Sequence, residues 1–236
     1  MISKSFNVWR ISSNLCQPWL LHKHYSKRCP NISYAFGLYD SRLELSGVCS
    51  YARPMSNTLV SGAMQGDYND KFLELNRLVV NEGLPTNTLS YFVSQTLKLL
   101  PTPCVIVSYA DTAQCHHGYI YQATNWIYTG LSAKFTDYAV EGMEHVHHAS
   151  IEDSVGRYDK NPEINKSKLL AEKYGEKLYR KERARKHRYF YFVGNKRQKK
   201  DMRRGLNYPE LPYPKGNNER YDASYIPQIQ HEMFGL

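Results

Sequence analysis

One short apolar run constrains the fold of this chain more than any other feature of its sequence. The run covers residues 104–109, reads CVIVSY, and contains three consecutive β-branched residues. Such a run is typical of a strand that is covered on both faces, because a strand with one solvated face alternates apolar with polar residues. We therefore expect this strand to lie inside a sheet that carries helices on its faces.

The rest of the chain predicts an α/β order around that strand. Strand patterns and turn residues predict further strands at 6–11, 32–39, 43–51, 72–80, 135–140 and 188–193. Helical spacing predicts helices at 12–21, 88–100, 116–126 and 166–186. Residues 195–218, rich in Lys, Arg, Pro and Gly, predict a tail that lies on the surface.

The composition limits the class of protein. A hydrophobic fraction of 42% in 236 residues suffices for one substantial core with an appendage. No window approaches the ~18 uninterrupted apolar residues of a membrane helix, and the first residues lack the layout of an export signal. We therefore expect a soluble, cytoplasmic protein with no membrane segment. Five cysteines without a CxxC spacing favour reduced thiols over a disulfide framework or a zinc ribbon.

Basic charge is concentrated in one part of the chain. The net charge is +9, and residues 157–220 hold 20 Lys and Arg against 8 Asp and Glu, so the remainder is slightly acidic. A polyanionic partner fits this distribution, because each neutralised phosphate releases condensed counterions. A solvated basic surface fits it equally well.

Three blocks of the sequence together resemble one known family. They comprise His24-Tyr25 with 35–39, then 108–111 with 117–130, and finally 186–189 with 211–215. Spanning nearly the whole chain, they resemble the Mom family of phage DNA-modification proteins. The resemblance implies a GNAT-like α/β fold: a mixed, mostly antiparallel sheet flanked by helices, with a basic C-terminal extension. It also implies conversion of adenine in double-stranded DNA to N6-carbamoylmethyladenine, which protects phage DNA from restriction in the cytoplasm of the host bacterium.

The resemblance and the charge distribution together predict two domains. Residues 1–156 are expected to form the GNAT-like catalytic core. Residues 157–236 are expected to form a basic helix, the final strand and a C-terminal DNA-binding extension that packs on the core.

The end of the buried strand supplies the first catalytic candidates. Asp111 follows the carboxyl end of that strand, the edge where open α/β sheets place ligands, and a carboxylate there is suited to accept a proton from an amine. Capping of the next helix is the structural alternative for Asp111. Ser108 and Tyr109 offer hydroxyls on opposite faces of the strand, and Tyr109 shares its face with Asp111.

His24 and Tyr25 are the second pair of catalytic candidates. His24 is suited to acid–base chemistry or substrate contact. In the family that the chain resembles, iron has been proposed at the His-Tyr pair. The spacing fixes no carboxylate and no third ligand near His22 and His24, so no metal ligand is assigned, and 145–148 is interpreted as a polar strand end.

The start of the predicted helix at 88–100 is the candidate donor site. Thr86, Asn87 and Thr88 would offer hydroxyls and backbone N–H groups to an anion, as the coenzyme A pyrophosphate site of GNAT proteins does. An ordinary N-cap at Thr86 or Thr88 explains them equally well. The glycine-spaced signature of coenzyme A sites is absent, since Gly83 stands alone and Pro85 removes a donor. The donor is therefore left open between an acyl-coenzyme A and an activated glycine such as glycyl-tRNA.

Two sets of residues are candidates for nucleic-acid contact. Tyr121 and Asn125 are expected to stack on and pair with an extruded base, although core packing also explains Tyr121. Basic side chains are expected to contact phosphates; they are Arg185, Arg188, Lys196, Arg197, Lys199, Lys200, Arg203 and Arg204.

Two other functions remain open from the sequence. One is an acyl-coenzyme A-dependent N-acyltransferase that acts on a small molecule or a protein. The other is a DNA-binding protein without catalysis. A carbamoylmethyl group joins the base through a methylene carbon, so a simple acetyl transfer does not produce it. This chemistry favours glycine as the donated unit, with tRNA as a further partner.

Overall fold

The computed structural model describes residues 5–66, 68–146, 148–156 and 165–216. The chain divides into two compact units, one formed by 1–131 with 186–236 and the other by 132–185. Neither junction coincides with the predicted boundary at 156/157. The strands β7 (Thr136–Val140) and β8 (Leu178–Glu182) pair with each other and so bring residues from both sides of that boundary into one unit.

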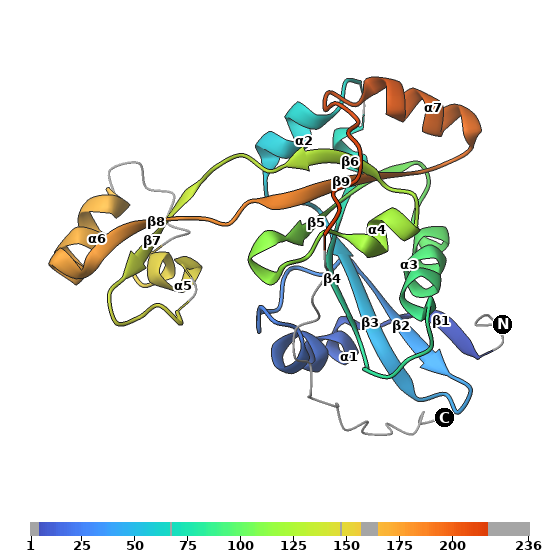
Figure 1. Cartoon of the computed structure of the whole chain (residues 1–236), viewed down its shortest axis with the longest axis horizontal. Coiled ribbons are helices and arrows are strands. Elements are labelled where there is room, and N and C mark those ends of the chain that lie inside the picture. Colours follow the sequence, from blue (N-terminus) through green and yellow to red (C-terminus); the bar gives the residue numbers. More distant parts are fainter. Residues whose placement is uncertain (1–4, 67, 147, 157–164, 217–236) are drawn as a thin grey trace. The chain divides into compact units, whose positions relative to one another are not determined.

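The first unit is built on a sheet of seven strands in the order β1-β2-β3-β4-β5-β9-β6 (Figure 1). Their bounds are β1 Phe6–Ile11, β2 Tyr34–Asp40, β3 Leu45–Ala52, β4 Phe72–Val80, β5 Cys104–Asp111, β6 Ile127–Leu131 and β9 Lys186–Val193. All neighbouring pairs are antiparallel except β4 and β5, which are parallel. The predicted mixed, mostly antiparallel α/β sheet flanked by helices is confirmed.

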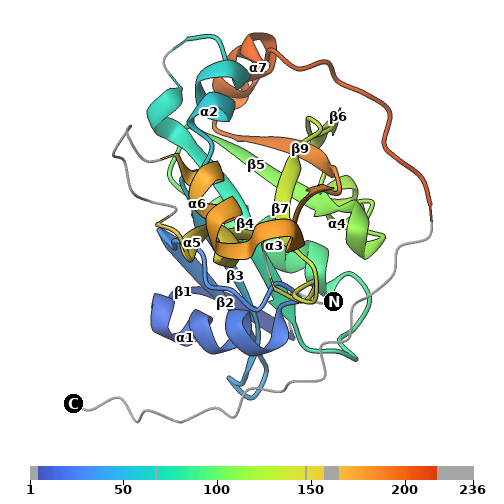
Figure 2. The same ribbon diagram turned by 90° about the vertical axis from the view of Figure 1, so that its left-hand side faces the viewer.

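The run at 104–109 is buried on both faces, as its composition predicts. Ile106 packs in one core cluster with α3 (Thr88–Leu99), whereas Val105 and Val107 pack in another with α2 (Asn57–Ala63) and α7 (Lys196–Gly205). Figures 1 and 2 show α3 on one face of the sheet and α2 with α7 on the other. The first unit is therefore a three-layered α/β arrangement.

The parallel pair β4 and β5 separates along its length. The strands are in register only from Phe72 opposite Val105 to Glu74 opposite Val107. β5 then continues alongside β9, while β4 continues alongside β3 with a register shift that leaves Asn76 as an extra residue. Because a bulge bends its strand and re-aims the side chains beside it, the carboxyl ends of β4 and β5 lie apart.

The second unit is a small α/β body. Its two-stranded sheet, β7 with β8, is accompanied by α5 (His148–Asp153), α6 (Lys166–Tyr174) and the 3-10 turn η5 (Gly175–Lys177). Val140, Ile151 and Leu170 form its buried core. The predicted helix at 166–186 is wrong beyond Tyr174. Gly175 adopts a positive φ of 57°, which ends the helix, and the following residues pair with β7.

Two other sequence predictions need correction. The predicted tail at 195–218 is helical over α7, because Asn195 and Gln198 form a reciprocal capping box at its start. The predicted helix at 116–126 is reduced to α4 (Tyr119–Ala123) and is followed by β6, which sequence patterns missed. Among the described residues, no helix combines the length and the apolar character needed to cross a membrane.

Candidate active site

A cavity of about 970 Å³ lies where β4 and β5 separate. Its walls come from the second half of β4, the end of β5, the loop before α3, and the segments around His24 and Tyr119. Eight of the predicted site residues line it, namely His24, Tyr25, Thr86, Asn87, Thr88, Tyr109, Asp111 and Tyr121. The structure therefore brings together side chains that are up to 97 positions apart in the sequence, all within the first unit.

Asp111 anchors one wall of this cavity. Its Oδ1 accepts a hydrogen bond from the backbone N–H of Ala113 at 3.0 Å, so the capping role considered from the sequence is present. Its Oδ2 accepts from the Tyr25 hydroxyl at 3.4 Å and lies 3.5 Å from Lys186 Nζ. One carboxylate oxygen thus holds the backbone turn while the other faces a phenol and an ammonium group.

A π-helical turn leads into His24 and Tyr25, and Tyr25 contacts this carboxylate. The turn η2 (Trp19–Lys23) follows α1 (Ser13–Pro18), and its buried Trp19 and Leu20 anchor it to the core. Such π turns occur frequently at functional sites. The backbone becomes extended at His24, which is only 6% exposed and whose ring lies 4.4 Å from that of Tyr25.

The hydrogen bonds of His24 define its tautomer. Its Nδ1 accepts from the backbone N–H of Ser26 at 3.1 Å, so in the neutral ring the proton resides on Nε2. Burial, together with nearby charges led by that of Arg77, lowers the pKa of His24 to about 3. At neutral pH His24 is therefore an uncharged imidazole that presents an N–H donor.

Arg77 is a cavity residue that sequence reasoning missed. It follows the extra residue of the β4 bulge, and its Nη1 donates to the Asn76 carbonyl at 2.7 Å. Its buried Nε has no hydrogen-bond partner within the described part of the chain, and burial lowers the pKa of its guanidinium. An arginine inside the run FLELNRLVV was the available signal, because a paired strand interior rarely holds an unexplained cation.

The two hydroxyls of β5 have different surroundings. Tyr109 lines the cavity, and burial raises the pKa of its phenol, so it remains a hydrogen-bond donor at neutral pH. Ser108 is buried beneath the wall, where it donates to the Leu75 carbonyl at 2.8 Å and shares a hydrogen bond of 2.7 Å with the Tyr121 hydroxyl. The geometry suits Ser108 to positioning Tyr121 rather than to direct contact with a substrate.

The start of α3 opens onto the same cavity. Its N-cap is Asn87, with a left-handed φ of 68° and no side-chain capping bond, so neither Thr86 nor Thr88 has the capping role considered from the sequence. Thr88 is 2% exposed, and its Oγ1 has no hydrogen-bond partner in the described structure. This helix terminus combines the positive end of the helix dipole with a buried hydroxyl, an arrangement that favours an anion.

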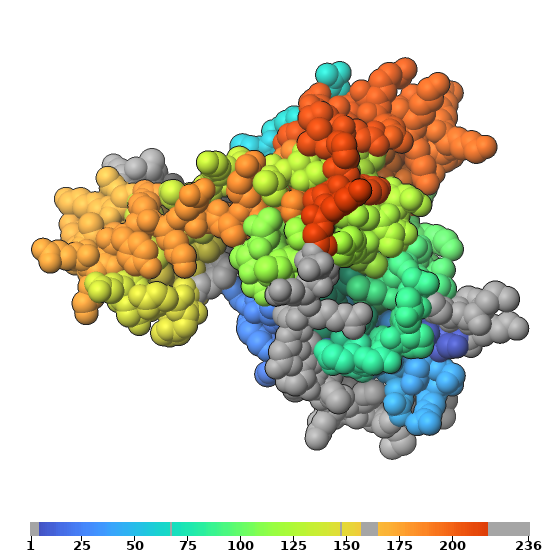
Figure 3. All heavy atoms as spheres, viewed as in Figure 1, coloured from blue at the N-terminus to red at the C-terminus, as the bar shows by residue number. Residues whose placement is uncertain are grey.

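The predicted nucleic-acid residues do not form one surface. Most lie on α7, whose ten residues include six Lys and Arg and one Asp, and which Figure 3 shows in orange as an exposed surface. Asn125 joins Lys199, Lys200 and Arg203 at a hollow of about 440 Å³ against the aromatic end of β9. Arg188 instead packs inward. Its Nε donates to Thr129 Oγ1 at 2.9 Å and its guanidinium lies 3.5 Å from the Tyr208 ring centroid.

The second unit carries little net charge. It contains eleven Lys and Arg against ten Asp and Glu, so the basic region predicted at 157–220 has its strongest local charge on α7. Arg185, at the end of this unit, donates from Nε to the Ser132 carbonyl at 2.6 Å. Among the described residues, one grouping of Asp, His and Glu has a spacing suited to a metal ion, and it lies in this unit at Asp137, His148 and Glu152.

Comparisons with known proteins place these features in a family. The model of the Mom protein family matches residues 5–215. Methylcarbamoylase mom of Escherichia phage Mu is 28% identical over 220 residues, which cover 90% of this chain and 85% of that protein.

The solved structures that the chain resembles include two acetyltransferases. The spermidine/spermine N-acetyltransferase SpeG of Vibrio cholerae has a TM-score of 0.42 at 8% identity, covering 82% of this chain and 95% of that one. A GNAT-family acetyltransferase of Bacillus cereus has a TM-score of 0.38 at 11% identity, covering 80% and 99%. Since the family match spans almost all of the described residues, the chain belongs to the Mom protein family.

Proposed function

We propose that this protein is a transferase that converts adenine in double-stranded DNA to N6-carbamoylmethyladenine and so protects phage DNA from restriction. The observation that carries the proposal is the cavity between β4 and β5. A carboxylate, a neutral imidazole and a helix N-terminus meet there, in a member of a family whose phage Mu relative is named a methylcarbamoylase.

The residues of the cavity have complementary roles in this proposal. Asp111 accepts the proton of the amine that attacks the donor carbonyl. Tyr109, held protonated by burial, donates a hydrogen bond to the carbonyl oxygen as it gains negative charge. His24 contributes its Nε2–H donor, while Tyr25 and Lys186 hold the second oxygen of Asp111 in place.

DNA recognition is assigned to α7 and its surroundings. The exposed Lys and Arg side chains of α7 contact phosphates, which supplies affinity without sequence preference. Residues that line a cavity of this kind cannot reach adenine N6 while the base is paired inside the duplex. The target base therefore leaves the stack and enters the cavity. Tyr121 forms part of the cavity wall that receives the base, and Asn125 contacts the DNA beside α7.

For the donor we propose an activated glycine, such as glycyl-tRNA. Attack of adenine N6 on the glycyl ester forms an amide and releases the ester hydroxyl. The glycyl amine then attacks C6 to form a five-membered spiro ring. Cleavage of the original C6–N6 bond expels that nitrogen as the terminal amide and yields the carbamoylmethyl product. The anion-binding start of α3 supports an acyl-coenzyme A as the second candidate donor.

Isotope labelling separates these routes. Adenine that carries heavy nitrogen at N6 is modified, and the position of the label in the product is read by fragment mass spectrometry. The glycyl route places the label in the terminal amide. A label that stays on the base rejects the rearrangement. Calorimetry with coenzyme A tests the second donor, since binding at the start of α3 requires a measurable affinity that Thr88→Val reduces.

The function itself is tested by nucleoside mass spectrometry. DNA from cells that express the protein is digested and compared with DNA from cells that express Asp111→Ala. We expect modified adenine with the wild type and none with the variant. Glu172→Ala on α6 is the control, because it removes an exposed carboxylate outside both the cavity and α7. Unmodified adenine in every sample, with all proteins folded and bound to DNA, would favour a DNA-binding protein without catalysis.

A further inference from the structure

The second unit has a small core for a folded body. Among the described residues of this unit, the buried apolar side chains are Val140, Ala149, Ile151 and Leu170, and its two strands contain five residues each. Units of this size bury little apolar surface, and disulfides or metal ions commonly stabilise them. The described part of this unit contains no cysteine. Of these two means of stabilisation, only a metal ion is therefore open to this unit.

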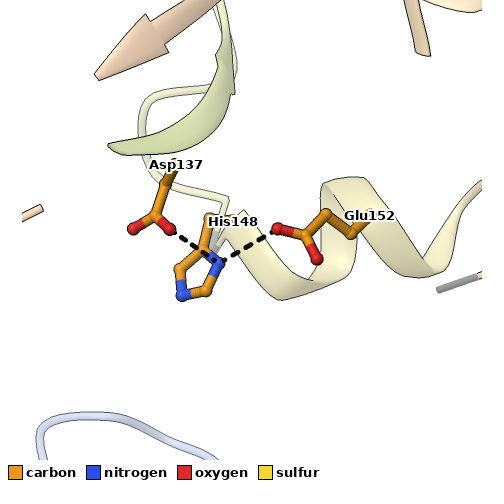
Figure 4. Close-up of side chains that lie close together, drawn as sticks. All are labelled: Asp137, His148 and Glu152. Atoms are coloured by element: carbon orange, nitrogen blue, oxygen red, sulfur yellow. Dashed lines mark ion pairs between the residues drawn. The ribbon is translucent and has the colours of Figure 1, made fainter. Parts of the chain in front are cut away.

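Three potential ligands meet in this unit (Figure 4). Asp137 comes from β7, while His148 and Glu152 lie one helical turn apart on α5. His148 Nδ1 lies 3.5 Å from Asp137 Oδ1 and 3.7 Å from Glu152 Oε1, and the three ligand atoms all lie within 4.8 Å of one another. All three side chains are partly buried.

These separations match those between neighbouring ligands of one cation. Hydrogen bonds between nitrogen and oxygen are usually about 2.7–3.2 Å long. Ligand atoms bound at ~2.1 Å around a tetrahedral zinc ion are instead ~3.4 Å apart. The two distances at His148 lie close to the second value, so the side chains are spaced as neighbouring ligands of one ion.

Arg183 fixes the orientation of the first ligand. Its Nε donates to Asp137 Oδ2 at 2.8 Å, and its Nη2 donates to Asp137 Oδ1. Metal-binding carboxylates are typically held by such outer hydrogen bonds.

We propose that Asp137, His148 and Glu152 bind a divalent transition-metal cation of the zinc class, which links β7 to α5. One imidazole nitrogen and two carboxylate oxygens suit zinc better than magnesium or calcium, which prefer all-oxygen sites. The fourth position is taken by water. This site shares no residue with the cavity of the first unit, and the proposal does not depend on the proposed reaction.

The test is calorimetric titration of Zn²⁺ into the full chain after treatment with EDTA. We expect one equivalent to bind, and His148→Ala and Glu152→Gln to abolish that binding. Arg183→Gln should weaken it about 10- to 100-fold, as loss of an outer hydrogen bond does at other metal sites. His145→Ala, an exposed histidine of the same segment, and His24→Ala in the cavity are the matched controls and should leave the stoichiometry unchanged.

Cobalt substitution provides a second readout that does not depend on the variants folding. We expect visible d–d bands without thiolate charge-transfer bands, because the proposed ligands include no sulfur. The proposal is overturned if the EDTA-treated chain binds no zinc. It is also overturned if the folded variants His148→Ala and Glu152→Gln still bind one equivalent of zinc, or if thiolate bands show that cysteines bind the metal.

Discussion

The cavity between β4 and β5 and the surface of α7 use charge in opposite ways. In the cavity, Asp111 and His24 are buried or half-buried, and named partners fix their geometry. On α7 most of the charged side chains are exposed, and ion pairs such as that of Arg203 with Glu210 hold some of them. Buried groups act through position, whereas exposed charges act additively and are screened by salt. Substitutions in the two regions should therefore change different observables.

The largest expected effect comes from Asp111→Asn. The amide keeps the shape of the side chain but accepts no proton, so the turnover of DNA should fall about 10²- to 10⁴-fold, the usual contribution of a general base. DNA affinity should stay within about twofold, because Asp111 lies in the cavity and not on α7. Turnover is measured as modified adenine per enzyme, and affinity by fluorescence anisotropy.

Asp201→Asn is the control for this substitution, since it removes a carboxylate from α7 and leaves the cavity intact. Equal losses of turnover in the two variants would contradict the separation of the two regions. A loss of DNA affinity by Asp111→Asn as large as its loss of turnover would contradict it as well.

The sequence predicts the two regions unequally, for physical reasons. The bounds of β4 and the two-sided burial of β5 follow from local apolar patterns, and both are observed. The bulge at Asn76 was not predicted, because it depends on how β4 pairs with β3. Since the bulge sets the position of Arg77, the place of Arg77 in the cavity was missed as well. Residues far apart in the chain were expected at one site only through the family resemblance.

α7 and β8 show two further limits of local patterns. The Lys- and Arg-rich composition of 195–218 suggests a surface tail, although Asn195 and Gln198 have the spacing of a capping box and were a readable signal. The residues of β8 continue a stretch of good helix formers, so local patterns predict that the helix extends through them. They form a strand instead because they pair with β7, and this tertiary contact overrides the local helix propensity. The first error was avoidable from the sequence, whereas the second was not.

The next effect in size concerns the stability of the cavity at acid pH. The pKa of His24 is about 3 in the folded chain, whereas an unburied histidine has a pKa of 6.5. Between these two pH values the unfolded state therefore binds a proton at His24 that the folded state does not bind. The contribution of neutral His24 to the free energy of unfolding is fully present above pH 6.5. The free energy of unfolding should then fall by up to ~1.4 kcal/mol per pH unit as the pH decreases toward 3.

Urea unfolding at pH 7.5, 5.5 and 4.5 measures this dependence. His24→Gln should unfold with a shallower dependence on pH than the wild type, whereas the exposed His145→Gln should match the wild type. Parallel pH profiles for the wild type and His24→Gln would refute the assignment of a buried neutral imidazole.

A smaller effect is expected from the double substitution Lys199→Ala and Lys200→Ala on α7. Loss of phosphate contacts should weaken DNA binding and reduce the slope of log affinity against log salt by about 0.9 for each contact removed. Turnover at saturating DNA should be unchanged, because neither side chain lines the cavity. Lys168→Ala, on α6 in the second unit, is the matched control and should keep the wild-type slope. A slope that is the same in all three proteins excludes phosphate binding by this part of α7.

The smallest expected effect separates the fold of α7 from its charge. Asn195→Ala removes the side chain that accepts from the Gln198 N–H at 2.9 Å, and loss of such a cap should cost about 0.5–2 kcal/mol. Asn165→Ala removes the equivalent cap of α6, where the side chain accepts from the Lys168 N–H at 3.1 Å. Both variants should lower the thermal midpoint slightly, but only Asn195→Ala should weaken DNA binding, because fraying of α7 disperses its cations. Equal weakening of DNA binding by both variants would mean that the second unit also contacts DNA. The comparison between the cavity and α7 would then have to include the second unit as a third region.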